Sequence, residues 1–197
     1  MVITGSVALV ALATLAGALV RLHLAPTGLS ALRDPVSQYG ISAFRGGYRA
    51  ATLAFAVAGV ALALALSRAL VHREAAIVAL LVVFAAARAV ISWLPMDKPG
   101  VQRTATGTAH GLLAIAAFGS ITAASLKLGR ALAEQARWHA LAGVSTTLGW
   151  LMLCLLGAMV ARRPLPALGR WFGAVERAFY ITAIAWCAIF AVAAVIA

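Results

Sequence analysis

Long apolar runs, separated by short polar segments, dominate the chain. Six runs are each long enough to cross the hydrocarbon core of a bilayer as a helix, and they cover about residues 2–22, 48–67, 75–95, 106–126, 138–161 and 175–197. A soluble core of this size could not bury six such helices. The pattern therefore predicts an all-α fold, a polytopic membrane protein in which residues 1–197 form a single domain and one bundle of six transmembrane helices.

Composition agrees with this pattern and removes one class of function. Hydrophobic residues make up 64% of the 197 positions and charged residues only 11%, with a mean hydropathy of +1.01. The net charge of +11 would suggest nucleic-acid binding in a soluble protein. Here the basic residues fall at helix ends and in connections, where they anchor helices, so we expect no nucleic-acid partner. The first charge, Arg21, follows the first run, which indicates a retained helix rather than a signal peptide.

The basic residues are distributed unequally between the two sets of connections. Connections 2–3 and 4–5 carry five: Arg68, Arg73, Lys127, Arg130 and Arg137. The odd connections, which are 1–2, 3–4 and 5–6, carry ten: Arg21, Arg33, Arg45, Arg49, Lys98, Arg103, Arg162, Arg163, Arg170 and Arg177. The positive-inside rule then places the odd connections in the cytoplasm and both termini outside.

Several ionisable residues should meet at the end of the bundle where the odd connections lie. Three of the five acids, Asp34, Asp97 and Glu176, belong to these connections or adjoin them, and His110 opens the fourth run on the same side. Arg88 lies seven residues before Pro95, roughly 10 Å below that surface. A guanidinium at this depth requires a partner or a wet cavity. Arg88 would therefore form a buried ion pair with one of the acids, or it would form the floor of a pocket for an anionic group.

Each polar motif also has a purely structural interpretation. In "RDPVSQYG", Asp34 would be a helix N-cap with Pro35 at the first helical position. In "PMDKPG", Asp97 with Pro99 and Gly100 would form a turn. In "GTAHG", the glycines at positions 107 and 111 have the GxxxG spacing that lets two helices approach, and His110 would be a hydrogen-bonded histidine near a helix end.

The same residues carry donor atoms that suit several kinds of chemistry. Asp34, Asp97, His110 and Glu176 offer metal-ligand atoms, but no HxxxH or HExxH element accompanies them. A relay of Ser37, His110 and Asp97 lacks a nucleophile-elbow sequence, and a haem would need His23 to face His110. We therefore predict no metal and no cofactor. Acid–base catalysis needs only a carboxylate or imidazole with a shifted pKa, so it stays open.

Four motifs in order, "DPVSQYG", "LPMDKPG", "TAHG" and "VERAFY", resemble a bacterial multi-pass membrane family known as domain-of-unknown-function family 998. The resemblance covers essentially the whole chain and implies about six spans in the bacterial cytoplasmic (inner) membrane. Two positions depart from the family pattern, because Leu94 replaces the usual aromatic and Gln38 the usual acid. The second departure argues against any mechanism that needs a carboxylate there. The family positions occupied in this chain are Asp34, Pro35, Ser37, Tyr39, Asp97, Pro99, Gly100, His110, Glu176 and Arg177.

Together these observations predict a polar pocket at one membrane face that binds a lipid-like or amphipathic anionic ligand, with catalysis and oligomeric state left open. Membrane lipids are the expected partners. A small-solute transporter and a non-catalytic membrane scaffold or subunit are the alternatives. The candidate catalytic residues are Asp34, Ser37, Asp97, His110 and Glu176, and the candidate ligand-binding residues are Arg33, Tyr39, Arg88, Lys98 and Arg177.

Overall fold

The computed structural model describes residues 1–69, 75–98, 100–162 and 164–196. Within these ranges the chain forms six α-helices joined by loops and three short 3-10 helices. The α-helices are α1 (Val2–Leu24), α2 (Arg45–Ala69), α3 (Ala75–Ile91), α4 (Ala105–Ala133), α5 (His139–Ala161) and α6 (Phe172–Ile196). The 3-10 helices are η1 (Val36–Ile41), η2 (Ala136–Trp138) and η3 (Pro166–Trp171).

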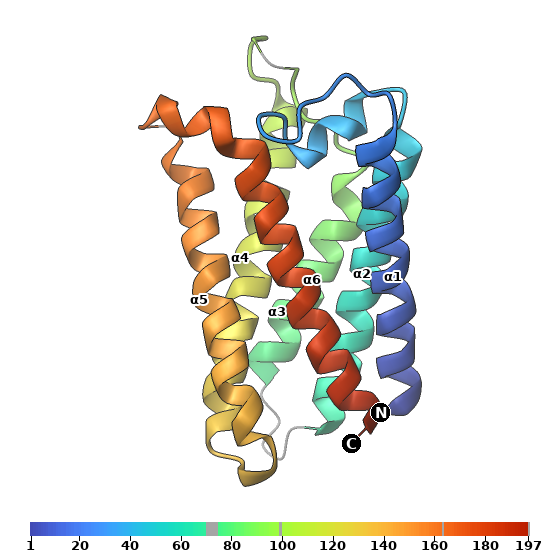
Figure 1. Cartoon of the computed structure of the whole chain (residues 1–197), viewed down its shortest axis with the longest axis vertical. Helices are drawn as coiled ribbons and strands as arrows, with labels where there is room; N and C mark the ends of the chain where they lie inside the picture. Colours follow the sequence, from blue (N-terminus) through green and yellow to red (C-terminus); the bar gives the residue numbers. More distant parts are fainter. Residues whose placement is uncertain (70–74, 99, 163, 197) are drawn as a thin grey trace.

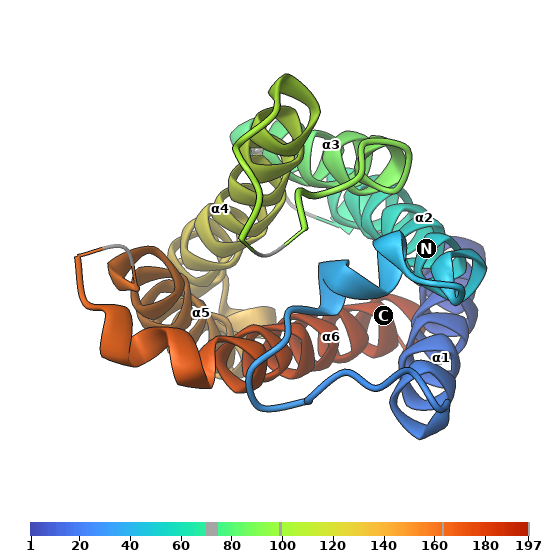
Figure 2. The same ribbon diagram turned by 90° about the horizontal axis from the view of Figure 1, so that it is seen from above.

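The six α-helices form a ring in chain order (Figure 2). Each helix packs against its neighbours in sequence, and α6 closes the ring by packing against α1. In addition, α6 contacts α2 across the interior. The element η1 lies over one end of this ring, where it contacts α2 and α6 (Figure 2).

One end of the bundle carries the three odd connections and the other carries both termini (Figure 1). The loop from α1 to α2, which includes η1, meets the α3–α4 loop and η3 at the first end. We call this the loop end of the molecule. The arrangement brings the polar motifs to one side of the bundle, as the sequence predicts. Arg73, Arg163 and Pro99 lie outside the described residues.

Most of the described α-helices have the length and composition of membrane spans. Five of them, α1, α2, α4, α5 and α6, are long and apolar enough to cross a bilayer, and α3 is a shorter apolar helix of 17 residues. Large apolar side chains such as Ile3, Val10 and Ile181 point outward, with 79%, 68% and 69% of their surface exposed. Apolar side chains on the outside of a bundle are expected where lipid is the solvent. The protein is a multi-pass helical membrane protein.

Aromatic rings fill the interior below the loop end. Phe55 of α2 packs edge-on against Phe84 of α3 at 4.8 Å, and Phe118 of α4 packs against Phe179 of α6 at 4.5 Å. Farther down, Trp186 of α6 is fully buried. The Phe118–Phe179 contact joins α4 to α6, and Phe55 also approaches Tyr180 of α6 at 6.0 Å, so aromatic side chains cross the interior and the middle of the bundle is a packed core.

Buried hydroxyls also tie the helices together. The Trp186 indole N–H donates to Oγ of Ser145 at 2.9 Å, and that hydroxyl donates to the carbonyl of Ser125 at 2.7 Å. The chain of bonds joins α6, α5 and α4. In a bilayer such bonds satisfy polar groups that lipid cannot hydrogen-bond, so they help to hold the apolar helices in register.

Two helix ends differ from the sequence-based prediction. The third span was predicted to reach Pro95, but α3 ends at Ile91, because proline disfavours helical geometry in the residue before it and removes a backbone donor. The fourth span was predicted to end before Lys127, but α4 continues to Ala133. Lysine and arginine are good helix formers, so Lys127 and Arg130 extend the helix into the polar region instead of ending it.

Candidate functional site

The four sequence motifs form one connected assembly at the loop end. The η1 segment is bonded to the start of α6 through Val36 and Glu176, and to the α3–α4 loop through Ser37 and Met96. That loop is bonded to the start of α4 through Asp97 and Thr104. Residues of these motifs separated by as many as 143 positions in the chain are therefore held together by specific hydrogen bonds.

Glu176 anchors η1 to α6. Its side chain is 5% exposed, and Oε2 accepts a hydrogen bond from the backbone N–H of Val36 at 2.7 Å. This N–H lies at the start of a 3-10 helix, where no helical carbonyl is available to accept it. Because Val36 is itself buried, the carboxylate satisfies a donor that water does not reach.

The prediction that Asp34 is the N-cap of this helix is wrong. The N-cap of η1 is Pro35, with extended geometry, and Asp34 is not the cap. Instead, Oδ2 of Asp34 accepts the backbone N–H of Ser30 at 2.7 Å and closes the preceding turn. A cap must place its oxygen over the first helical N–H groups, and here Glu176 from α6 occupies that position over Val36.

Arg177 clamps the loop to the helices. One terminal nitrogen, Nη1, donates to the carbonyls of Asp34 at 2.7 Å and of Gly173 at 2.9 Å. The other, Nη2, contacts the Tyr39 hydroxyl at 3.4 Å. Nε donates to Nε2 of His23 at 2.6 Å, which joins α6 to the end of α1. The planar fork of an arginine suits such multiple contacts, so Arg177 acts here as a structural clamp.

Gly173 allows this close approach. A Cβ at this position would lie 2.6 Å from the carbonyl oxygen of Asp34 and 2.7 Å from that of Ala31. Both obstacles are backbone atoms, which cannot move without displacing the loop. Any side chain at residue 173 would therefore push the α1–α2 loop away from α6 and weaken the Arg177 contacts.

Asp97 and Thr104 build the start of α4. The Thr104 hydroxyl donates to Oδ1 of Asp97 at 2.6 Å and accepts from the Gly107 N–H at 3.0 Å, and the Thr104 N–H donates to Oδ2 at 3.1 Å. These bonds from Thr104 hold the pKa of Asp97 below its usual range. A Cβ at residue 107 would collide with the Asp97 carboxylate. The GxxxG interpretation is therefore wrong at Gly107, which makes room for a carboxylate and not for a second helix.

Replacing Thr104 with valine should destabilise the loop end, because the N-cap hydroxyl and its bond to Asp97 are both lost. We expect the free energy of unfolding to fall by about 1 kcal/mol near neutral pH. Thr104→Ser keeps the hydroxyl and should behave like the wild type. The Asp97 contribution is present above the pKa of an unfolded aspartate and disappears as the pH falls through the lowered folded pKa. Unfolding in detergent micelles at several pH values measures both effects, and equal loss in the serine variant would contradict this role.

His110 is buried at the start of α4, with 6% of its surface exposed. Its Nδ1 lies 2.7 Å from the carbonyl oxygen of Leu94. Because a carbonyl only accepts, Nδ1 carries the proton in this bond. Arg88 and Asp97 are among the charged groups that interact electrostatically with the ring. His110 therefore ties the start of α4 to the α3–α4 loop.

Arg88 is the charged residue buried most completely, with 1% of its surface exposed. Its guanidinium lies over the rings of Phe55 at 5.7 Å and Tyr180 at 5.2 Å. Glu176 attracts it electrostatically but uses Oε2 for Val36. Among the residues that the structure describes, Arg88 has no ion pair with a carboxylate, so the predicted alternative of a direct buried ion pair is wrong.

Several buried polar atoms of this region have no hydrogen-bond partner. Nε of Arg88 and the hydroxyl of Tyr48 are buried without a hydrogen-bond partner, as is Oγ of Ser92, one turn farther along the chain. The Tyr48 side chain is 2% exposed and interacts electrostatically with both Arg88 and Tyr180. Buried polar atoms nearly always have partners in folded proteins. We call Arg88, Tyr48, Tyr180 and Glu176 the buried polar site.

The other predicted site residues do not belong to the buried polar site. Ser37 donates to the sulfur of Met96 at 3.2 Å rather than to His110, so the relay of Ser37, His110 and Asp97 does not form. Arg33 and Lys98 are exposed on the loops. His23 uses Nδ1 toward the carbonyl of Leu19 and Nε2 toward Arg177, which leaves neither nitrogen for a haem. In the described part of the chain, no three His, Cys, Asp or Glu side chains gather as a metal site requires.

Sequence reasoning missed both tyrosines of the buried polar site. Tyr180 lies four residues after Glu176, so the two share a helix face, and this spacing within "VERAFY" could have indicated it. Tyr48 stands at the polar start of an apolar run, and nothing in its sequence surroundings indicates that it belongs to a site. Only the packing of α2 against α3 and α6 reveals that its hydroxyl points inward.

Comparison with known proteins agrees with the arrangement of motifs. No curated protein and no solved structure matches the chain. The model of one family, described as a protein of unknown function (DUF998), matches residues 6–193. This match includes all four motifs and every residue of the buried polar site. The chain belongs to the DUF998 family.

Proposed function

We propose that this protein binds the anionic head of a lipid-like, amphipathic molecule in the buried polar site, within the bacterial cytoplasmic membrane. The observation that carries the proposal is the pair of buried, unpartnered donors, Nε of Arg88 and the hydroxyl of Tyr48. A phosphate or carboxylate oxygen would accept from both. Charge-assisted bonds of this kind are the strong ones, and an arginine fork suits such anions.

The surroundings of Arg88 favour an amphipathic ligand. Phe55 and Tyr180 supply apolar surface around the guanidinium, so a hydrocarbon portion could pack there. Arg88 stands seven residues before Pro95, roughly 10 Å from the membrane surface. This depth lies between the headgroups and the middle of the bilayer. The family resemblance supports a bacterial membrane, and the basic odd connections support a cytoplasmic location for the loop end.

The transporter alternative is less favoured because the interior below Arg88 is packed with large apolar rings. Phe84 lies one turn below Arg88 on α3, and Trp186 fills the core farther down. The purely structural alternative explains the clamp at Arg177 and the cap at Asp97. It does not explain why Nε of the buried Arg88 and the buried hydroxyl of Tyr48 lack hydrogen-bond partners. If the ligand is also a substrate, Glu176 and His110 are the residues that would move a proton.

The proposal can be tested with short-chain ligands on delipidated protein. Dioctanoyl phosphatidic acid and decanoate present the two anionic heads, and dioctanoyl phosphatidylcholine is the zwitterionic control. We expect at least one anionic ligand to raise the unfolding temperature in detergent and phosphatidylcholine to leave it unchanged. The stronger of the two anionic responses identifies the head. If neither anionic ligand stabilises the protein more than phosphatidylcholine does, the proposal is wrong.

Replacing Tyr48 with phenylalanine separates ligand binding from folding. Without ligand, the variant should be more stable than the wild type by about 1–3 kcal/mol, because an unpaired buried hydroxyl is removed. Affinity for the anionic ligand should fall by roughly tenfold, the equivalent of one hydrogen bond. Tyr39→Phe is the matched control. Its hydroxyl has a protein partner in Arg177, so its loss should lower stability and leave affinity unchanged.

We therefore expect the two phenylalanine variants to change the free energy of unfolding in opposite directions, upward for Tyr48→Phe and downward for Tyr39→Phe. A Tyr48→Phe protein that unfolds more easily and binds the anionic ligand as tightly as the wild type would show that the hydroxyl supports the fold. That result would remove the observation on which the proposed function depends.

A further inference from the structure

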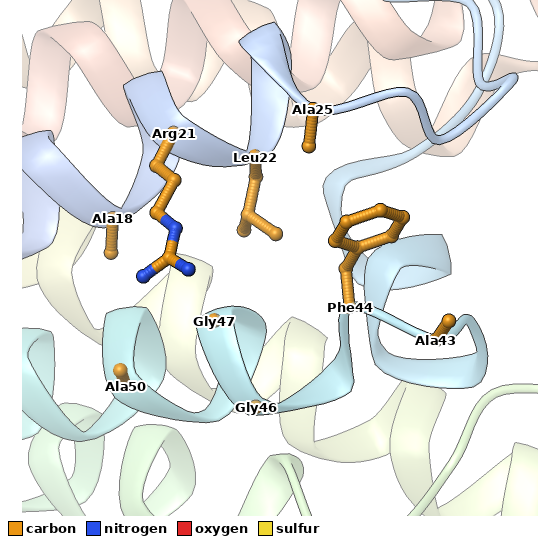
Figure 3. A pocket seen from close by; sticks show the side chains of 9 residues that line it. All are labelled: Ala18, Arg21, Leu22, Ala25, Ala43, Phe44, Gly46, Gly47 and Ala50. Carbon is orange, nitrogen blue, oxygen red and sulfur yellow. The ribbon is translucent and has the colours of Figure 1, made fainter.

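A groove runs along the outside of the bundle between α1 and α2, away from the buried polar site. Its upper part is a hollow of about 300 Å³ beside Arg21, Leu22, Phe44 and Gly47 (Figure 3). Its lower part is a more open hollow of about 500 Å³. Both parts are lined by Ala50, so they adjoin. The lower part is lined by Ser6, Val7, Val10, Ala11, Thr14, Ala50, Leu53, Ala54 and Val57.

Small residues make the groove, and exposed apolar side chains form its rim. The upper wall consists largely of Ala18, Gly46, Gly47 and Ala50, which leave space between the two helices (Figure 3). Below them, Val7, Val10 and Val57 of the lower part are 44%, 68% and 49% exposed. The groove therefore faces the lipid side of the bundle, and hydrocarbon is the solvent at this depth.

Arg21 lies within the upper part of the groove, between Ala18 and Ala25 along the chain (Figure 3). Its side chain extends from α1 across the hollow toward α2 (Figure 3). The guanidinium has no hydrogen bond or ion pair with another residue in the described ranges. Arg21 belongs to the last turn of α1, at the loop end of the molecule. This is the level at which we expect lipid headgroups. A positive charge above an apolar groove complements a lipid that has an anionic phosphate above its chain.

We propose that this groove binds one anionic phospholipid, with an acyl chain between α1 and α2 and the phosphate on Arg21. Arg21 and Ser6 are fifteen residues apart, which is roughly 22 Å along a helix. The hydrocarbon of one leaflet is about 15 Å thick, so the groove holds the chain of a single leaflet lipid along its whole length. The basic odd connections place Arg21 at the cytoplasmic surface, where anionic lipids are enriched. The groove does not depend on the buried polar site.

The test is lipid retention measured by native mass spectrometry of the whole protein, with phosphatidylglycerol and phosphatidylcholine of matched chains. Wild-type protein should retain phosphatidylglycerol more tightly than phosphatidylcholine. Arg21→Gln should weaken phosphatidylglycerol retention by about fivefold and abolish the preference between the two lipids. Arg88→Met, which affects the buried polar site, should leave this preference unchanged. The groove proposal and the proposed function of the buried polar site can therefore be disproved independently of each other.

A second variant fills the groove without disturbing the fold. A Cβ at Gly46 would meet no atom within 4 Å, so Gly46→Leu can extend into the hollow and should reduce retention of both lipids by at least about tenfold. Gly143→Leu on α5 is the matched control, because a Cβ there also meets nothing within 4 Å. It should retain lipid like the wild type.

Three results would overturn the proposal. They are equal retention of the two lipids by the wild type, unchanged preference in Arg21→Gln, and unchanged retention in Gly46→Leu. If Gly46→Leu instead converts a dimer to a monomer while lipid retention stays the same, a second protein helix occupies the groove, and the lipid proposal is wrong.

Discussion

Replacing Arg88 with methionine is expected to abolish binding of the anionic ligand while the protein stays folded. Arg88 supplies the positive charge of the buried polar site and at least one free donor, Nε. Loss of the guanidinium charge together with this donor would weaken binding by at least about a hundredfold. Methionine has a similar length and no charge to bury, so the desolvation cost of the guanidinium disappears and we expect the fold to be retained. Ligand-dependent unfolding in detergent measures both quantities.

Arg88→Lys is the informative control for this prediction. Lysine keeps the charge but lacks the planar fork and Nε, so it should bind the anionic ligand more weakly than arginine and more tightly than methionine. Two outcomes contradict the account. One is anionic-ligand affinity in Arg88→Met within a few fold of the wild type. The other is a methionine variant that fails to fold, which would show that the guanidinium stabilises the bundle itself.

Replacing Glu176 with leucine should have the largest effect on stability. The carboxylate accepts the buried N–H of Val36, and leucine would leave that donor unpaired. We expect the free energy of unfolding to fall by about 1–3 kcal/mol, with η1 detached from α6. Increased hydrogen exchange confined to the η1 segment, together with the lower unfolding temperature, would identify the lost anchor.

Glu176→Gln separates the hydrogen bond from the charge. The amide oxygen can still accept from Val36, so stability should stay close to that of the wild type. The substitution also removes a carboxylate that interacts electrostatically with Arg88, so an anionic ligand should bind as tightly as before or more tightly. If glutamine destabilises the protein as much as leucine, the anchor role is wrong. If glutamine alone abolishes ligand binding, the carboxylate takes a direct part that the electrostatic argument does not include.

Most of the fold could be predicted from the apolar pattern. A run of about twenty apolar residues has few alternatives to a membrane helix, and six of them fix which connections share a face. Helix ends were predicted less well, because they depend on local chemistry. Pro95 ends α3 several residues early, whereas Lys127 does not end α4. A charge can extend from a helix into the polar region, but a proline cannot continue the hydrogen-bond pattern.

The candidate site was predictable in its location but not in its contacts. Topology alone places Asp34, Asp97, His110 and Glu176 at one end of the bundle. Which atoms meet is decided by the loops, and hydrophobic periodicity contains no information about them. Asp97 stabilises the start of α4, and Asp34 closes a turn, so neither carboxylate pairs with Arg88. The depth of Arg88 was evident from its distance to Pro95, but its neighbours Tyr48 and Tyr180 required the packed helices.

The most direct test is an experimental density map of the protein in lipid nanodiscs that contain its anionic ligand. The central claim predicts elongated non-protein density whose head lies within hydrogen-bonding distance of Nε of Arg88 and the hydroxyl of Tyr48. Density consistent only with a water molecule at these atoms, or a rearranged Glu176 carboxylate bonded to Arg88, would contradict it.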